Sequence, residues 1–107
     1  MKSDLEILKR LFETIKSRKG TDAKSSYTAS LFAKGPNHCA RKFGEEAVET
    51  IIAGTQTDKQ ALINESADSI YHLMVLLAAR DIDLSDVVTE LERREGVSGH
   101  DEKVSRQ

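Results

Sequence analysis

The chain has 107 residues, which is enough for one hydrophobic core and too few for two, so we expect one domain or one subunit of an assembly. With 16 Lys and Arg against 18 Asp and Glu, its net charge of -2 argues against a protein that binds nucleic acid through the phosphates. The one cysteine, Cys39, excludes an internal disulfide, and the low aromatic content of 5% favours packed helices over a sheet, so the predicted fold class is all-α.

The first helix is predicted over residues 4–18. Ser3 and Glu6 have the spacing of a capping box, and apolar residues then recur every three or four positions. Gly20 can end the helix. Charged residues follow Met1 without an apolar leader, so we expect a cytoplasmic protein.

The next segment, residues 21–35, is polar and basic and is interpreted as a long loop, with room for one turn of helix near residues 28–32. Pro36 is typical of a first helical position, and Gly54 of a helix end, so a second helix is predicted up to about residue 53. Its predicted apolar face consists of Cys39, Ala40, Phe43, Ala47 and Ile51.

The third helix is predicted over residues 58–80, where Thr57 and Gln60 have capping-box spacing. Its later part, residues 73–79, is the longest apolar run in the chain and is too short to span a membrane. Because this run is apolar on every side, it needs cover all round, and we expect a second subunit to complete the bundle.

A fourth, short helix is predicted from Leu84 to about residue 95. We therefore expect a four-helix subunit with a long central helix, formed by a domain over residues 1–95 and followed by a polar tail over residues 96–107.

Acidic residues mark the second and third predicted helices. Glu45, Glu46 and Glu49 lie within a 100° arc of the second helix, opposite the predicted apolar face, and Glu65 and Asp68 lie one turn apart on the third. If the two helices pack antiparallel, four or five carboxylates converge. The acidic motif alone also fits a solvated helix face, and this simpler interpretation has about even weight.

A converging set of carboxylates needs a cation, because like charges repel. Mg²⁺ prefers oxygen ligands and retains waters that phosphate oxygens can replace, so it is the expected ion. Zinc fits poorly without a His and Cys ligand set, and a di-iron bundle would need Glu-x-x-His on two helices, which the sequence lacks.

Several other residues have both a functional and a structural interpretation. His72 shares a helix face with Asp68 and can orient a carboxylate, although a structural role is favoured about two to one. Lys34 and Lys42 flank the acidic turn and are candidate anchors for phosphate groups. Glu92 and Glu95 repeat the acidic spacing, but arginines separate them, so they are interpreted as helix surface.

The acidic pair resembles the motifs of the all-α nucleoside-triphosphate pyrophosphohydrolases, the MazG-like and dimeric dUTPase group. Further segments are similar to one family in that group, the phosphoribosyl-ATP pyrophosphohydrolases of histidine biosynthesis, and the likeness runs from about Leu5 to the tail. These segments are SYTA at 26–29, FAKG at 32–35, KFGEEAVET at 42–50, Asn64-Glu65, Ala67-Asp68, YHL at 71–73 and LERR at 91–94.

The resemblance implies a homodimeric enzyme that uses Mg²⁺ to hydrolyse phosphoribosyl-ATP to phosphoribosyl-AMP and pyrophosphate. By position, Glu46, Glu49, Glu65 and Asp68 would be the metal ligands, and Glu45 would be an auxiliary ligand or would position water. The family is often fused to the cyclohydrolase that acts next, and the length of this chain leads us to expect a stand-alone enzyme.

Two alternatives remain open from the sequence. One is the same chemistry on another nucleotide, as in a housecleaning pyrophosphatase. The other is a helical interaction module whose acidic residues only keep it soluble, in which case Mg²⁺ would leave its thermal stability unchanged.

Overall fold

The computed structural model describes residues 3–97, 99, 100 and 103. These residues form five helices and no strand, which confirms the all-α class: α1 (Asp4–Ser17), α2 (Tyr27–Ala33), α3 (Pro36–Gly54), α4 (Lys59–Ala79) and α5 (Leu84–Arg93). None of these helices is long and apolar enough to cross a membrane. Much of the predicted tail, residues 96–107, lies outside the described residues.

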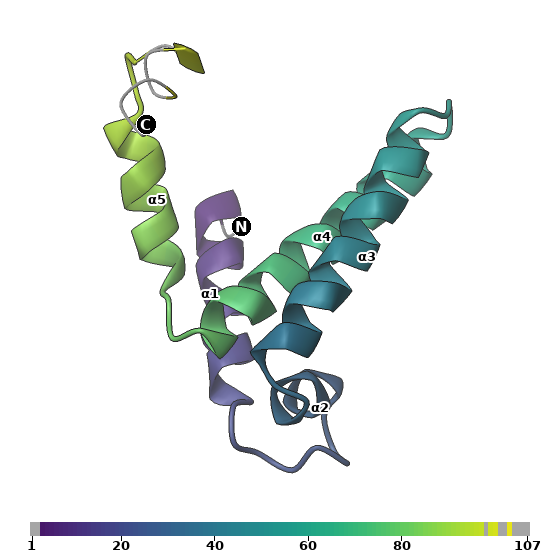
Figure 1. Ribbon diagram of the computed structural model, residues 1–107, viewed down its shortest axis with the longest axis vertical. Helices are drawn as coiled ribbons and strands as arrows, with labels where there is room; N and C mark the ends of the chain where they lie inside the picture. Colours follow the sequence, from purple (N-terminus) through teal and green to yellow (C-terminus); the bar gives the residue numbers. More distant parts are fainter. Residues whose placement is uncertain (1–2, 98, 101–102, 104–107) are drawn as a thin grey trace.

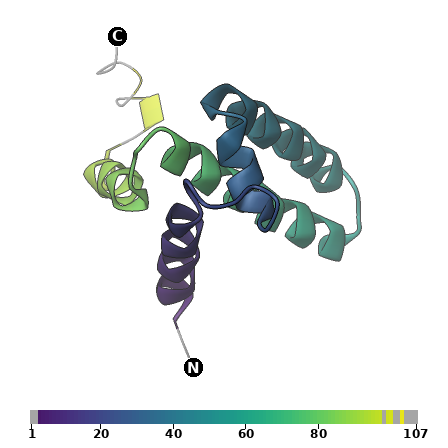
Figure 2. The same ribbon diagram turned by 90° about the horizontal axis from the view of Figure 1, so that it is seen from below.

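The helices are arranged as a V (Figure 1). One arm is a hairpin in which α3 and α4 run antiparallel, and the other side of the V is formed by α1 and α5, with α2 at the base. Figure 2 shows from below that α3 and α4 lie side by side along their length, while the end of α4 reaches across towards α5. The antiparallel packing of these two long helices is the feature that positions the acidic residues.

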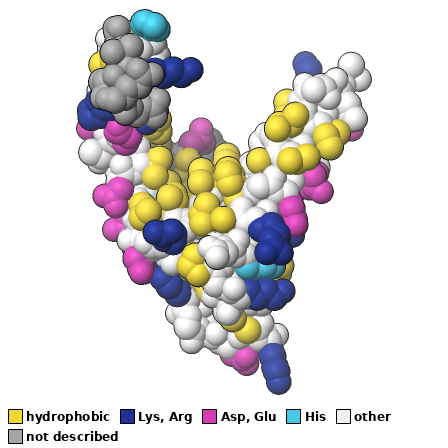
Figure 3. All heavy atoms as spheres, in the orientation of Figure 1, with side chains coloured by type: hydrophobic (Ala, Val, Ile, Leu, Met, Phe, Trp, Pro, Cys, Tyr) yellow, Lys and Arg dark blue, Asp and Glu magenta, His cyan; other side chains and the backbone are white. Residues whose placement is uncertain are grey.

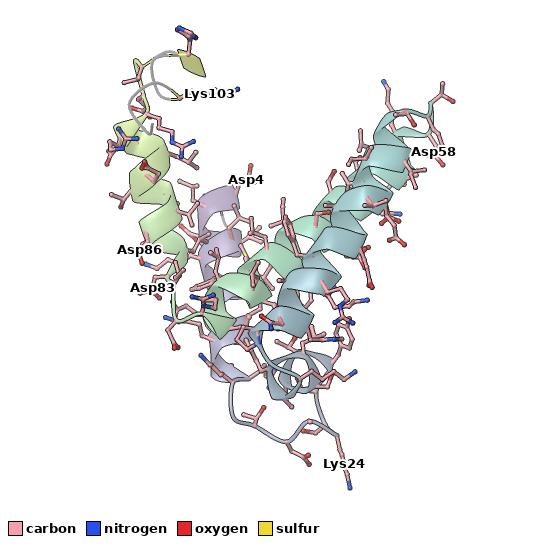
Figure 4. The ribbon with its side chains drawn as sticks, in the orientation of Figure 1. Asp4, Lys24, Asp58, Asp83, Asp86 and Lys103 are labelled. Atoms are coloured by element: carbon pink, nitrogen blue, oxygen red, sulfur yellow. The ribbon has the colours of Figure 1, made fainter. Side chains whose placement is uncertain are left out.

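Local capping sets the helix starts, and one predicted cap is wrong. The Ser3 hydroxyl accepts the Glu6 amide hydrogen at 3.2 Å, as the capping box predicts. At α4, however, the cap is Asp58 and not Thr57, since the Asp58 carboxylate accepts the amide hydrogens of Gln60 and Ala61 at 3.0 and 3.2 Å. A carboxylate suits this position because it also opposes the positive end of the helix dipole. Figure 4 shows Asp58 at the outer end of the hairpin.

The helix α2 occupies the second half of the predicted loop and extends the single turn expected near residues 28–32, so the described residues contain five helices and not four. Its seven residues begin after Ser26, whose hydroxyl accepts the Ala29 amide hydrogen at 3.2 Å. Ala29 and Leu31 are buried against the rest of the chain. Tertiary packing therefore stabilises a helix that is too short to form by itself.

The hydrophobic core lies at the base of the V. It consists of Phe12, Ile15, Leu31, Cys39, Met74, Val75 and Ala78. The chain's own helices thus bury one side of the apolar run at 73–79, while Leu76, Leu77 and Ala79 are only partly buried. Cys39 is a small buried residue of this core, and its thiol donates to the Leu31 carbonyl at 3.4 Å.

The outer half of α3 is oriented differently from the prediction. Glu46 and Thr50 are half-buried and face α4, whereas Ile51 is 65% exposed and Ala40 is also exposed. Val48 and Ile52 are about half exposed. Glu46 and Thr50 therefore pack towards α4 in this arm, whereas Glu45 and Glu49 are exposed, and Val48, Ile51 and Ile52 form an apolar surface that faces out.

An apolar groove occupies the notch of the V, between α1, α4 and α5. It encloses about 700 Å³, and its lining includes Leu8, Ile70, Leu84, Val88 and Leu91. The space-filling view shows hydrophobic side chains gathered on the walls of the notch (Figure 3). Val88 and Leu91 are 56% and 59% exposed, so this groove and the outer side of α3 are two apolar surfaces left uncovered within the subunit.

Candidate active site

Three of the predicted acidic residues converge between α3 and α4. Glu46 and Glu49 project from successive turns of α3, Glu65 projects from α4, and one carboxylate oxygen from each lies within 4.8 Å of the others. The antiparallel hairpin brings these turns to the same level, as the sequence predicts. We call these three residues the acidic cluster.

The two other predicted acidic residues lie beside the acidic cluster. Asp68 is exposed one turn beyond Glu65 on α4, and its charge contributes to the raised pKa values of Glu46 and Glu65. Glu45 turns to Lys42, and its Oε2 atom lies 3.1 Å from the lysine Nζ atom. The structure therefore brings together three of the four predicted ligands, with Asp68 close by and Glu45 paired to a cation.

The pKa values of the acidic cluster are raised, which shows that its negative charge is poorly balanced by positive charge. Burial raises the pKa of Glu65, and the neighbouring carboxylate of Glu49 raises it further. Burial and Glu49 likewise raise the pKa of Glu46, while Lys42 opposes the shift. Among the described residues, the buried Oε2 atom of Glu65 has no hydrogen-bond partner. The cluster therefore combines mutual repulsion with an unsatisfied acceptor oxygen.

These pKa shifts predict how stability depends on pH without metal. Because Glu46 and Glu65 have a pKa above the ordinary 4.5, the folded chain binds protons before the unfolded chain as the pH falls. Their destabilising contribution is therefore greatest at pH 7.5 and declines as the pH falls through the raised pKa values. We expect Glu65→Gln in EDTA to melt at a higher temperature than the parent at pH 7.5, with a smaller difference at pH 5.

The control for this measurement is Glu95→Gln, which changes an exposed acid away from the hairpin. Its difference in melting temperature from the parent should vary less between the two pH values. A Glu65→Gln variant that is less stable than the parent at pH 7.5 in EDTA would contradict repulsion within the acidic cluster.

A small open pocket lies next to the acidic cluster, with a volume of about 270 Å³. Glu49 and Glu65 line it together with Ile52, Ala53, Gln56 and Ala61. The sequence analysis did not single out Gln56 or the small residues. Their only signal is position, since Ile52, Ala53 and Ala61 lie one turn from the acids on α3 and α4, and Gln56 lies in the connection between these helices.

The candidate phosphate anchors lie towards the base of α3. Lys34 is the exposed C-cap of α2, and Lys42 lies in the first half of α3, where Glu45 raises the pKa of its ammonium group. Figure 3 shows Lys and Arg side chains gathered next to acidic ones on this face of the hairpin. A cationic surface thus borders the acidic one.

His72 is a buried residue of α4, and its Nδ1 atom has no hydrogen-bond partner among the described residues. The side chain is 5% exposed, and its ring meets those of Tyr71 and Tyr27 edge-on at centroid distances of 5.0 and 6.2 Å. Burial, followed by the charge of Lys42, lowers the pKa of the imidazole, so it is neutral at pH 7. The Tyr71 hydroxyl in turn hydrogen-bonds Thr28, which fastens α2 to α4.

The fold and the site together define an all-helical protein with a carboxylate cluster on an antiparallel helix pair. Residues 8–95 match the family model described as phosphoribosyl-ATP pyrophosphohydrolase, and the chain belongs to this family. The match spans all five helices except the start of α1.

Relatives of this family are similar over almost their whole length. The phosphoribosyl-ATP pyrophosphatase of Paracoccus denitrificans is 62% identical over 99 residues, which cover 92% of each chain. The protein of the same name from Dinoroseobacter shibae is 58% identical over 102 residues, 95% of this chain and 100% of the relative. That of Rhodobacter capsulatus is 58% identical over 99 residues, 92% of this chain and 96% of the relative.

Proposed function

We propose that this chain hydrolyses phosphoribosyl-ATP to phosphoribosyl-AMP and pyrophosphate, the second step of histidine biosynthesis, in the cytoplasm. Membership of the family and relatives of that name support this activity. The observation that carries the proposal is the convergence of Glu46, Glu49 and Glu65 beside an open pocket, in a fold where the family's motif residues meet.

The donor set of the acidic cluster fits Mg²⁺. All three candidate donors are carboxylate oxygens, and the unpartnered Oε2 atom of Glu65 is free to accept a ligand bond. Glu46, Glu49 and Glu65 would hold the ion, with Asp68 as the fourth candidate. When bound, Mg²⁺ neutralises charge on the triphosphate and on the departing pyrophosphate.

The chain's other residues bind the substrate and orient water. Lys42, whose charge partly offsets the rise in the pKa of Glu46, and Lys34, the C-cap of α2, would attract phosphate groups, and Glu45 would accept a hydrogen bond from the attacking water. The pocket-lining residues carry no hydroxyl or thiol that could act as a nucleophile. Direct attack of water on phosphorus, with release of pyrophosphate as the P–O bond breaks, is therefore the simplest scheme.

We also propose that the working form is a homodimer. The same chain exposes an apolar groove in the notch and an apolar outer side on the hairpin arm, so a second copy can cover both. If the hairpin arm of each subunit inserts into the notch of the other, the two contacts are equivalent and are related by a two-fold axis. Such a dimer leaves neither surface exposed for further association. The occupant of the groove is therefore a second copy of this chain.

Turnover with a substrate panel tests the proposed activity. We expect release of pyrophosphate from phosphoribosyl-ATP with Mg²⁺, and a loss of at least about 100-fold in EDTA, because the acidic cluster cannot stabilise phosphate charge alone. ATP, dUTP and the other common triphosphates should react much more slowly. Faster turnover of a common triphosphate would favour the housecleaning enzyme, and no turnover of any substrate would favour the interaction module.

A further inference from the structure

A pair of hydroxyl groups lies between α3 and α4 next to the acidic cluster. Thr50 on α3 and Ser69 on α4 approach each other with their oxygen atoms 2.6 Å apart. The Thr50 oxygen is also 2.9 Å from the carbonyl oxygen of Glu46 on its own helix, and 2.9 Å from that of Glu65 on the facing helix. This contact therefore joins the backbones of two members of the acidic cluster.

The two hydroxyl residues lie between the turns of Glu46 and Glu65. Thr50 follows Glu46 by four residues on α3, and Ser69 follows Glu65 by four residues on α4, and because the helices run antiparallel, these two steps lead towards each other. The hydrogen bonds of the two hydroxyl groups depend on each other. Each hydroxyl has one proton, so when Ser69 donates to Thr50, Thr50 is left to donate to one of the two carbonyls.

The contact opposes a force that the acidic cluster itself creates. The carboxylates of Glu46 and Glu49 on α3 face that of Glu65 on α4, and their repulsion pushes the two helices apart until a cation arrives. A half-buried hydrogen bond between the helices is worth at least as much as the repulsion of one partly exposed pair of like charges. The hydroxyl pair can therefore hold the helices in place before the ion binds.

We propose that Thr50 and Ser69 are positioning residues for the metal site, and that their hydroxyl pair keeps the turns of Glu46 and Glu65 at the separation that a divalent cation needs. This inference rests on the proposed function, because it takes the acidic cluster to be the cation site. The effect is one of preorganisation, since the cluster then binds an ion without first drawing two helices together.

The test is the affinity for Mg²⁺ alone, measured by titration calorimetry on the full chain without substrate. Thr50→Val keeps the shape of the side chain and removes the hydroxyl. We expect it to raise the Kd for Mg²⁺ about tenfold or more, which is the usual effect of losing a group that orients metal ligands. Thr50→Ser restores the hydroxyl and should bind within about twofold of the parent.

The matched control is Thr55→Val at the end of the same helix. The Thr55 hydroxyl donates to the Ile52 carbonyl of its own helix, at 2.8 Å, and to no residue of α4 among those that the structure describes, so its removal should leave the Kd for Mg²⁺ unchanged. Circular dichroism and thermal melting in EDTA show whether each variant is folded. Should Thr50→Val fail to fold, Ser69→Ala removes the other hydroxyl and should raise the Kd at least about threefold.

The results separate this inference from the proposed function. A parent chain that binds no Mg²⁺ removes the metal site and the inference with it. A parent that binds Mg²⁺, together with a folded Thr50→Val or Ser69→Ala variant that binds equally well, overturns the inference and leaves the proposed function standing. Loss of affinity in Thr50→Ser as large as in Thr50→Val also overturns it, because packing and not the hydroxyl would then be responsible.

Discussion

Replacing Glu49 with glutamine is expected to reduce the turnover of phosphoribosyl-ATP at least about 100-fold, because a neutral amide replaces one of the three converging carboxylates that we propose as metal ligands. Glu49 is the member of the acidic cluster that raises the pKa of both Glu46 and Glu65, so it lies close to each. The substitution changes the charge with little change in shape. Its effect should therefore fall on metal binding and catalysis and not on folding.

Steady-state kinetics with saturating Mg²⁺ and thermal melting provide the measurement. Mg²⁺ should raise the melting temperature of the parent chain and have little effect on Glu49→Gln, because an ion stabilises only the state that binds it. Glu92→Gln, an exposed change on α5 outside the hairpin, should retain turnover within about twofold. Full activity of Glu49→Gln would exclude the acidic cluster as the catalytic site.

A glutamate in place of Val88 is expected to dissociate the proposed dimer. Val88 lies on α5 in the wall of the notch and is 56% exposed in the subunit, so the substitution does little to the isolated fold. In the dimer the new carboxylate would be buried without a partner, at a cost of several kcal/mol. The dimer Kd should therefore rise at least about 100-fold.

Sedimentation equilibrium over a range of concentrations measures this change. Thr89→Glu places the same charge on the next residue of α5, which is exposed and does not line the groove, and should leave the Kd close to that of the parent. A parent chain that is monomeric at high micromolar concentration would end the proposal of a dimer. A folded Val88→Glu variant that remains dimeric would show that the notch is not the interface.

Local signals in the sequence predicted most helix boundaries. The predicted range 4–18 corresponds to α1 (Asp4–Ser17), where the Ser3 cap and Gly20 act locally, and 58–80 corresponds to α4 (Lys59–Ala79), although its cap is Asp58 and no glycine follows it. The structure confirms the all-α class, and the match to the family model confirms the family likeness. By contrast, α2 was predicted only as one possible turn near residues 28–32, because it is seven residues long and is stabilised by distant contacts of Ala29 and Leu31.

The orientation of α3 could not be predicted from its pattern. Helical periodicity tells which residues share a face, but it does not tell whether the apolar face meets the same chain or another one. Here Cys39 of the predicted apolar face is buried, but Ala40 and Ile51 are exposed and Glu46 is half-buried, so the predicted inward face was wrong in part. The meeting of Glu46, Glu49 and Glu65 was predicted, whereas the separate pairing of Glu45 with Lys42 depends on side-chain conformation.

The two helices of the hairpin are close together in sequence, and this should affect the rate of folding. Thr50 and Ser69, which join α3 to α4 next to the acidic cluster, are separated by only 19 residues. Such short-range contacts form early during folding, since little chain entropy is lost in closing so small a loop. Divalent cations present during refolding should therefore speed the reaction as well as stabilise its product, because the ligands can assemble before α1 and α5 dock.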